Sequence, residues 1–178
     1  MPRYILTGTP GAGKTAILRH LEQDGYATVE EAATDVIALQ HALGIPEPWR
    51  DPGFIDRIVG LQQRRQIAAD ALSRGVVLFD RSPVCTLALS RHLGLAPSRA
   101  LRDEVDRLQT ERLYERTVFF VRNLGFVEAT AARRITLDEA MAFERLHELA
   151  YLELGFDLVE VPAGPLPARV ALVRKMLA

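Results

Sequence analysis

One short segment near the N-terminus constrains this chain more than any other part of the sequence. Residues 8–15 read GTPGAGKT and match the phosphate-loop pattern GxxxxGK[ST] at every defined position. Residues 3–7 before the loop are typical of a short buried strand, and residues 16–21 after it are typical of a helix. A strand, a glycine-rich loop and a helix in this order offer backbone N–H groups to phosphate oxygens. The segment therefore predicts a nucleoside triphosphate site.

The residue types within the loop have physical reasons. Wrapping a backbone around phosphates needs conformations that only glycine adopts cheaply, which explains the three glycines. Lys14 would bring its charge to the β- and γ-phosphates, and the hydroxyl of Thr15 is placed to ligate Mg²⁺. The alternative is a glycine-rich turn that happens to contain Lys-Thr. The candidate nucleotide-binding residues here are Gly8, Thr9, Pro10, Gly11, Ala12, Gly13, Lys14, Thr15 and Ala16.

Five short apolar runs alternate with stretches of helical periodicity along the rest of the chain. This alternation is typical of an α/β fold with a mainly parallel sheet. The expected strands are residues 3–7, 27–29, 76–79, 117–121 and 157–161, and the expected helices after the first are 32–43, 54–72, 83–93, 98–116, 137–154 and 166–177. With no linker visible, we expect residues 1–178 to form one doubly wound, five-stranded domain flanked by helices.

Local signals refine three of these elements. Ser98 is the expected N-cap of the helix that follows it. Thr136 and Glu139 have the spacing of a capping box at the start of the helix 137–154. Residues 45–53 contain three prolines in seven positions and are expected to be neither helix nor strand. Trp49 in this loop either stacks on a ligand ring or anchors its own loop.

Composition excludes several other classes of protein. The net charge of -1 gives no electrostatic reason to expect nucleic-acid binding. The single cysteine, Cys85, excludes an internal disulfide and is expected to be packed rather than reactive. No apolar stretch is long enough for a membrane span, and the chain enters a strand at once, so we expect neither a membrane anchor nor a signal peptide. We therefore expect a cytoplasmic protein, and its oligomeric state stays open.

Polar side chains follow two further strands of the predicted sheet. Asp80 ends the strand 76–79, and in a chain with a phosphate loop it would hold Mg²⁺ or accept a proton, with Arg81 beside it for a phosphate or an anionic acceptor. Alternatively, Asp80 caps the next helix and Arg81 pairs at the surface. Glu31 follows the strand 27–29 and would orient an acceptor hydroxyl. The alternative is that Glu30 and Glu31 only complement a helix dipole.

The segment 125–135 is expected to be a mobile lid. It is rich in small residues and carries Arg133 and Arg134 just before a capped helix. One of these arginines would reach the transferred phosphate when the lid closes. The alternative is a surface loop with two solvated arginines. The four histidines fall in helical stretches with no shared spacing, so no zinc site is expected.

The chain resembles the kinase-like P-loop domains grouped with predicted AAA-type ATPases, and is similar to nicotinamide riboside kinase domains. The resemblance spans the whole chain. It departs at residues 128–132, which read EATAA, because alanines stand just before the paired arginines where many members have an acidic or aromatic residue. It implies ATP·Mg²⁺ as co-substrate and adenine contacts at Pro162, Ala163 and Gly164. Besides the loop, the matching segments are 29–33, 79–81, 118–120, 133–135, 151 and 154–162.

These features together favour transfer of the γ-phosphoryl group of ATP to a small, hydroxyl-bearing, nucleoside-like acceptor. Lys14, Glu31, Asp80, Arg81, Arg133 and Arg134 are the candidate catalytic residues, with Thr15 and Asp80 for Mg²⁺. One rival is a slow NTPase or nucleotide switch that acts on a protein partner. Another is a non-catalytic module for a nucleotide or an anionic lipid headgroup. No guanine-reading N/T-K-x-D segment is present, which favours adenine. One side chain of the run 62–66 is a candidate for the acceptor cleft.

Overall fold

The central sheet has five strands in the order β2-β3-β1-β4-β5, and every neighbouring pair is parallel. The computed structural model of the chain describes residues 1–72, 75–125 and 136–177. The strands are β1 (Arg3–Thr7), β2 (Ala27–Val29), β3 (Val77–Asp80), β4 (Thr117–Val121) and β5 (Asp157–Val161). The predicted doubly wound α/β fold is confirmed. β3 contains Asp80 itself, so this side chain belongs to the last residue of a strand rather than to a loop.

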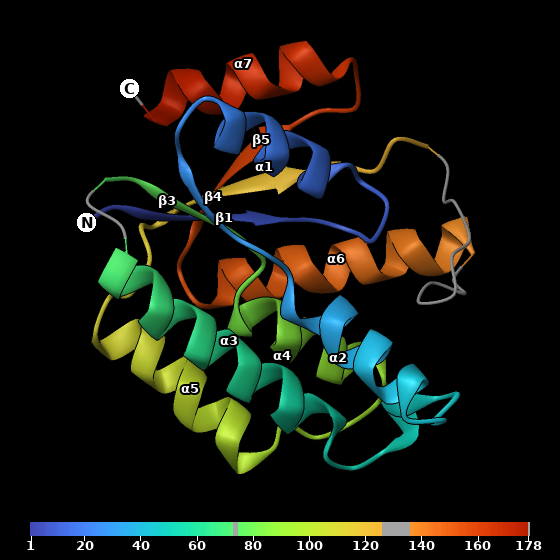
Figure 1. Cartoon of the computed structure of the whole chain (residues 1–178). Helices are drawn as coiled ribbons and strands as arrows, with labels where there is room; N and C mark the ends of the chain where they lie inside the picture. The colour runs from blue at the N-terminus through green and yellow to red at the C-terminus, as the bar shows by residue number, and fades with distance from the viewer. Residues whose placement is uncertain (73–74, 126–135, 178) are drawn as a thin grey trace.

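Helices cover both faces of this sheet (Figure 1). α1 and α7 lie on one face, and the other helices lie on the opposite face. Successive strand residues point to opposite faces, so Leu6 packs into the core beneath α1 and α7 while Ile5 packs into the larger core on the other face. The helices are α1 (Lys14–Gln23), α2 (Ala32–Ala42), α3 (Phe54–Leu72), α4 (Pro83–His92), α5 (Arg99–Thr110), α6 (Leu137–Glu153) and α7 (Leu166–Leu177).

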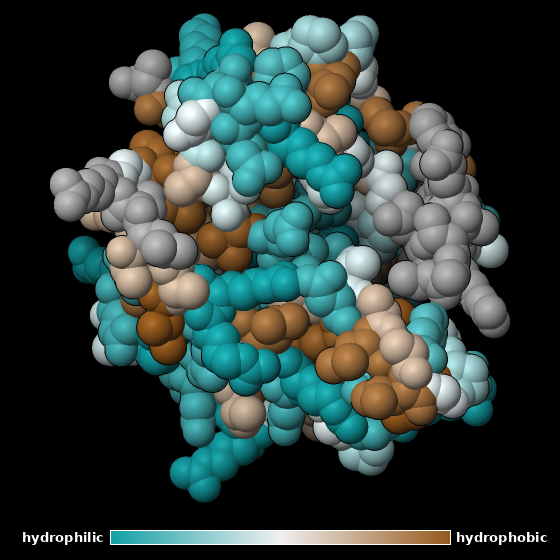
Figure 2. All heavy atoms as spheres, in the orientation of Figure 1, coloured by the Kyte–Doolittle hydropathy of each residue, from teal (hydrophilic) through white to brown (hydrophobic). Residues whose placement is uncertain are grey.

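The helix caps form as the sequence predicts. The Ser98 hydroxyl accepts a hydrogen bond from the N–H of Leu101 at the start of α5. Thr136 and Glu139 form the complete capping box of α6. Apolar side chains also reach the surface near α2, where Leu39 and the C-cap residue Leu43 are exposed. Figure 2 shows hydrophobic side chains gathered over this part of the molecule.

Two predictions of element boundaries are wrong. α5 ends at Thr110 rather than near residue 116, because Arg112 takes a left-handed conformation with φ of 50° and the Leu113 N–H returns to the Leu108 carbonyl. The segment 45–53 is not wholly irregular, because Pro48–Arg50 forms one turn of 3₁₀-helix. Proline suits that first position, where no N–H is needed.

The strand order brings the functional candidates to one edge of the sheet. The chain leaves β1 toward α1 on one face and leaves β3 toward α4 on the other, although β1 and β3 are neighbours. Such a switch point opens a crevice at the carboxyl ends of the strands. The phosphate loop, Glu31 and Asp80 therefore converge there. Within the described ranges, no helix has the length and hydropathy needed to cross a membrane.

Candidate functional site

The phosphate loop is built tightly against β4. Gly8 has φ of 131°, and a Cβ at this position would lie 2.1 Å from the carbonyl oxygen of Val121, so only glycine fits. Gly13, with φ of 85°, is the N-cap of α1, and the first helical hydrogen bond runs from the Ile17 N–H to the Gly13 carbonyl. The backbone N–H groups of the helix residues before Ile17, which are residues 14–16, therefore have no carbonyl partner within the helix and are available to phosphate oxygens.

The side chain of Lys14 folds back over the first residues of the phosphate loop. Its ammonium donates to the carbonyl oxygens of Thr9 at 2.8 Å and of Gly8 at 3.2 Å. Burial and the positive charge of Arg81 lower the pKa of Lys14 to about 8, although Asp80 acts in the opposite direction. A bound phosphate would add negative charge beside this buried ammonium and would therefore raise its pKa.

Thr15 and Asp80 meet across the β1–β3 crevice. The Thr15 hydroxyl donates to Asp80 Oδ2 at 3.0 Å, while Asp80 Oδ1 is buried and has no hydrogen-bond partner among the described residues. Burial raises the pKa of the Asp80 carboxyl, and the nearby Lys14 charge offsets this only in part. A hydroxyl and an unpartnered carboxylate oxygen are the hard oxygen ligands that Mg²⁺ takes beside nucleotide phosphates. The two residues therefore fit a bound magnesium ion.

Glu31, Arg81 and His147 form a chain of contacts in which Arg81 and His147 are buried and Glu31 is partly exposed. Arg81 has φ of 72°, which turns its side chain into the site, and its Nε lies 2.5 Å from Glu31 Oε1. Its Nη1 lies 2.8 Å from His147 Nε2, and His147 Nδ1 lies 2.8 Å from the Phe143 carbonyl oxygen. Because a guanidinium can only donate, Nε2 accepts and the ring proton sits on Nδ1. Burial and the charge of Arg81 hold the pKa of His147 well below its usual range, so the ring is neutral.

These contacts decide between the alternatives left by the sequence. Ser82, rather than Asp80, caps α4 by accepting from the Val84 N–H. Arg81 is buried and pairs with Glu31 instead of with a surface carboxylate. Burial disfavours the charged form of Glu31, but the charges of Arg81 and Lys14 outweigh it and lower the pKa. Glu31 is thus an ionised carboxylate that faces the site, whereas Glu30 is exposed.

Residues to which the sequence analysis assigned no role in the site support it from α6. The Tyr151 hydroxyl lies 2.7 Å from the Ser82 hydroxyl and 3.1 Å from the Cys85 sulfur. Phe143, His147 and Tyr151 are spaced by four residues, and this spacing on one helix face was the available signal. Cys85 is buried, as expected, and its sulfur also lies 3.2 Å from the Thr7 hydroxyl.

Two more missed residues hold the phosphate loop from distant parts of the chain. Asn123, just after β4, donates through Nδ2 to the Thr9 hydroxyl at 3.1 Å. Arg169 on α7 donates to the Ala12 carbonyl at 2.8 Å and to the Arg122 carbonyl at 3.1 Å. Both side chains are buried. No local motif marks either residue, because each is defined only by its contact with the loop.

A cavity of about 490 Å³ opens beside the phosphate loop. Pro10, Glu31 and Arg81 line it, together with Gln62 from α3. Its walls also carry the aromatic side chains of Trp49, Phe54 and Phe143. The Thr86 hydroxyl, another part of the lining, donates to Gln62 Oε1 at 3.0 Å. The ion pair of Glu31 and Arg81 thus belongs to a ring-sized cavity next to the loop.

The remaining candidate residues lie elsewhere. Arg133 and Arg134, and all of the predicted lid except Gly125, lie outside the described residues. Pro162, Ala163 and Gly164 form an exposed turn between β5 and α7 and do not line the cavity. Their place as an adenine contact stays a prediction. Among the described residues, no three His, Cys, Asp or Glu side chains form a metal-binding group.

Comparisons with known proteins agree with this architecture. A family model described as an AAA domain matches residues 3–169, and the chain belongs to this family. A search of curated proteins found no match. A solved structure of deoxyadenosine kinase from M. mycoides with the products dCMP and a flexible dCDP bound has a TM-score of 0.64 at 15% identity, covering 98% of both chains. Another, with bound dATP, has a TM-score of 0.58 at 16% identity, covering 99% of both chains. The fold is that of a kinase-like P-loop NTPase.

Proposed function

We propose that this protein binds ATP at the phosphate loop and transfers its γ-phosphoryl group to a hydroxyl of a small, nucleoside-like acceptor. The observation that carries the proposal is that the phosphate loop forms part of the wall of the cavity in which the acceptor would bind. Pro10 of the loop and the ion pair of Glu31 and Arg81 line the same cavity of about 490 Å³. An acceptor in this cavity would lie beside the end of the nucleotide, which is the arrangement that in-line transfer requires.

The residues divide the work of the transfer among them. Lys14 exchanges its two carbonyl contacts for phosphate oxygens and neutralises charge on the transferred group. The acceptor hydroxyl oxygen forms a bond to the γ-phosphorus while the bond from phosphorus to the β–γ bridging oxygen breaks, and ADP leaves with that electron pair. Glu31 orients the hydroxyl and takes its proton. Arg81 holds the Glu31 carboxylate in place.

Thr15 and Asp80 would hold the magnesium ion that accompanies ATP. When bound, this ion neutralises charge on the β- and γ-phosphate oxygens. The support is the hydroxyl-to-carboxylate contact and the unpartnered Oδ1 of Asp80. Burial raises the pKa of Asp80, and a bound cation would favour the ionised carboxylate.

The cavity favours an acceptor that carries a ring and no phosphate. Arg81 is the one guanidinium or ammonium among its described lining residues, and Glu31 already pairs with it. Glu47 adds a second carboxylate to the lining. An acceptor phosphate would therefore be repelled. Trp49 and Phe143 offer apolar faces to a ring, and the amide of Gln62 offers a hydrogen bond to its polar edge.

The two rival functions make different demands on this cavity. A nucleotide switch needs a surface for a protein partner, and a binding module needs no acceptor site at all. A concave site whose lining includes aromatic side chains and the Glu31 carboxylate favours a small-molecule acceptor. The three functions separate in one assay, because only a phosphotransferase forms a phosphorylated small molecule.

The proposal is tested with γ-labelled ATP, Mg²⁺ and a panel of nucleosides, the corresponding nucleoside monophosphates and sugars. We expect label in at least one nucleoside and none in the monophosphates. Glu31→Gln should lower turnover by about a hundredfold or more because the hydroxyl loses its proton acceptor, while ATP affinity stays near the parent value. Glu30→Gln is the matched control, since that neighbouring carboxylate is exposed. Label found only in inorganic phosphate would contradict the proposal and support a hydrolase.

A further inference from the structure

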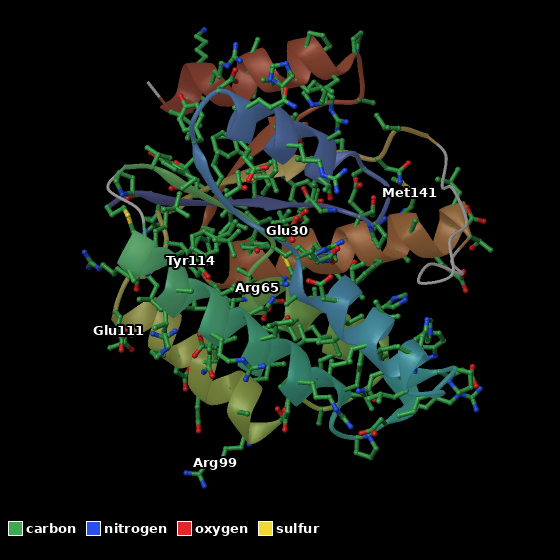
Figure 3. All side chains as sticks on the ribbon, viewed as in Figure 1. Glu30, Arg65, Arg99, Glu111, Tyr114 and Met141 are labelled. Carbon is green, nitrogen blue, oxygen red and sulfur yellow. The ribbon has the colours of Figure 1, made fainter. Side chains whose placement is uncertain are left out.

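Arg65 is a cation of α3 that reaches across to the connection between β2 and α2. Its Nη1 donates to two successive carbonyl oxygens, that of Glu30 at 3.0 Å and that of Glu31 at 2.7 Å. Its Nη2 pairs with the Asp35 carboxylate on α2. Figure 3 shows Arg65 on α3 with Glu30 nearby on this connection. One side chain thus binds the backbone of the segment that carries Glu31.

This segment receives little support from the sheet. β2 is an edge strand of three residues, and its pairing with β3 ends at Val29 opposite Phe79. Glu30 and Glu31 therefore lie beyond the last rung of the ladder. Glu31 is the N-cap residue of α2, yet its side chain caps no helix N–H. Arg65 donates hydrogen bonds to the carbonyl oxygens of Glu30 and Glu31, just past the residue where pairing with β3 ends.

The side chain of Glu31 is held from another direction. Arg81 lies against Oε1, and the Thr34 hydroxyl donates to Oε2 at 2.9 Å. The backbone contact from Arg65 and these side-chain contacts together fix both ends of the Glu31 residue. A shift of its backbone would move the carboxylate relative to the phosphate loop, even with Arg81 unchanged. Even a small displacement of the carboxylate matters, because a misplacement of about 1 Å can lower the rate of transfer a hundredfold.

We propose that Arg65 is a positioning residue for the phosphoryl transfer, which fixes the backbone at Glu30 and Glu31 so that the Glu31 carboxylate meets the acceptor hydroxyl. This inference rests on the proposed function of Glu31. Lysine cannot replace arginine fully here, because its point charge lacks the planar fork that binds two carbonyls and a carboxylate together. If Arg65 served only to join α2 to α3, its important contact would be the ion pair with Asp35 on α2, and not the hydrogen bonds to the two carbonyl oxygens.

The chain offers a matched control next to Arg65. Arg64 has the same charge on the same helix and is exposed. We expect Arg65→Met to lower kcat by about tenfold to a hundredfold with the KM for ATP unchanged, since misplacement of the acceptor base affects the transition state. Arg65→Lys should recover part of the loss. Arg64→Met and Asp35→Asn should transfer at close to the parent rate.

Amide hydrogen exchange gives a second readout that needs no acceptor. Arg65→Met should accelerate exchange at residues 30–36, whereas Arg64→Met should leave it at the parent rate. Parent exchange and parent kcat in Arg65→Met would overturn the inference, as would equal losses of kcat in Asp35→Asn. If the parent phosphorylates no acceptor, the proposed function fails and the catalytic purpose of Arg65 with it. Exchange would still report whether Arg65 fixes this backbone.

Discussion

Four ionisable side chains of the site, the buried Lys14, Asp80 and Arg81 and the partly exposed Glu31, lie close enough to change one another's proton affinity. The charge of Arg81 lowers the pKa of both Lys14 and Glu31, while that of Lys14 opposes the burial that raises the pKa of Asp80. Two cations and two carboxylates therefore balance without a ligand. The arriving phosphates upset that balance and require Lys14 to be fully charged.

Nucleotide affinity should therefore depend on pH through Lys14. Its pKa of about 8 lies below the ordinary 10.5, and bound phosphates favour the protonated form, so binding takes up a proton above about pH 8. ATP affinity should be insensitive to this group below that pH and fall by up to about tenfold per pH unit above it. Calorimetry at about pH 9 in buffers of different ionisation enthalpy measures the uptake. Lys14→Met should abolish it, and a parent protein that takes up no proton would contradict the assignment.

At the scale of elements, α6 aligns the ends of two strands. Glu144 accepts from the Asn123 N–H at 3.1 Å after β4, and His147 and Tyr151 contact Arg81 and Ser82 after β3. The three α6 residues lie at helical spacing on one face. This helix therefore fixes the distance between the phosphate-loop side of the site and the acceptor side.

Removing the acceptor atom of His147 should show this alignment. In His147→Leu the buried Nη1 of Arg81 loses its partner, which should cost about 1–3 kcal/mol of stability and raise the KM for the acceptor. His147→Gln keeps an oxygen in reach and should recover part of both losses. Tyr151→Phe is the control for a lost buried hydrogen bond on the same helix. It leaves the contact between His147 and Arg81 in place, so it should lower stability with a smaller change in KM than His147→Leu causes. Thermal denaturation and steady-state kinetics measure the two effects. An unchanged acceptor KM in His147→Leu would contradict the role.

The elements and site residues that could be predicted are those whose signal lies within a short stretch of the sequence. The phosphate loop, the strand ending at Asp80 and the capping box of α6 are each encoded within a few neighbouring residues. The partners of the site are not, since Arg81 and His147 are 66 residues apart and Ala12 and Arg169 are 157 apart. The end of α5 also escaped prediction, because a left-handed Arg112 stops the helix where the sequence shows no glycine or proline.

At the scale of the whole molecule, the phosphate loop joins the two layers of helices. Arg169 reaches it from α7 on one face, and Asp80 reaches Thr15 from the strand that continues into α4 on the other. Asn123 binds it from the segment just after β4. A nucleotide held by this loop would thus be linked to both cores, and its binding free energy should stabilise the entire fold.

MgATP should therefore stabilise the parent protein and raise its unfolding temperature. At a ligand concentration of a hundred times Kd, the free energy of unfolding should increase by about 2.7 kcal/mol. Gly8→Ala should abolish this shift, because its Cβ would lie 2.1 Å from the Val121 carbonyl oxygen and force the loop away from β4. Gly25→Ala is the matched control. Gly25 also has a positive φ, of 94°, but a Cβ there meets nothing within 4 Å. It should lose about 1–2 kcal/mol from backbone strain yet keep the full MgATP shift. A parent-sized shift in Gly8→Ala, measured by circular dichroism during heating, would show that the nucleotide binds away from this loop.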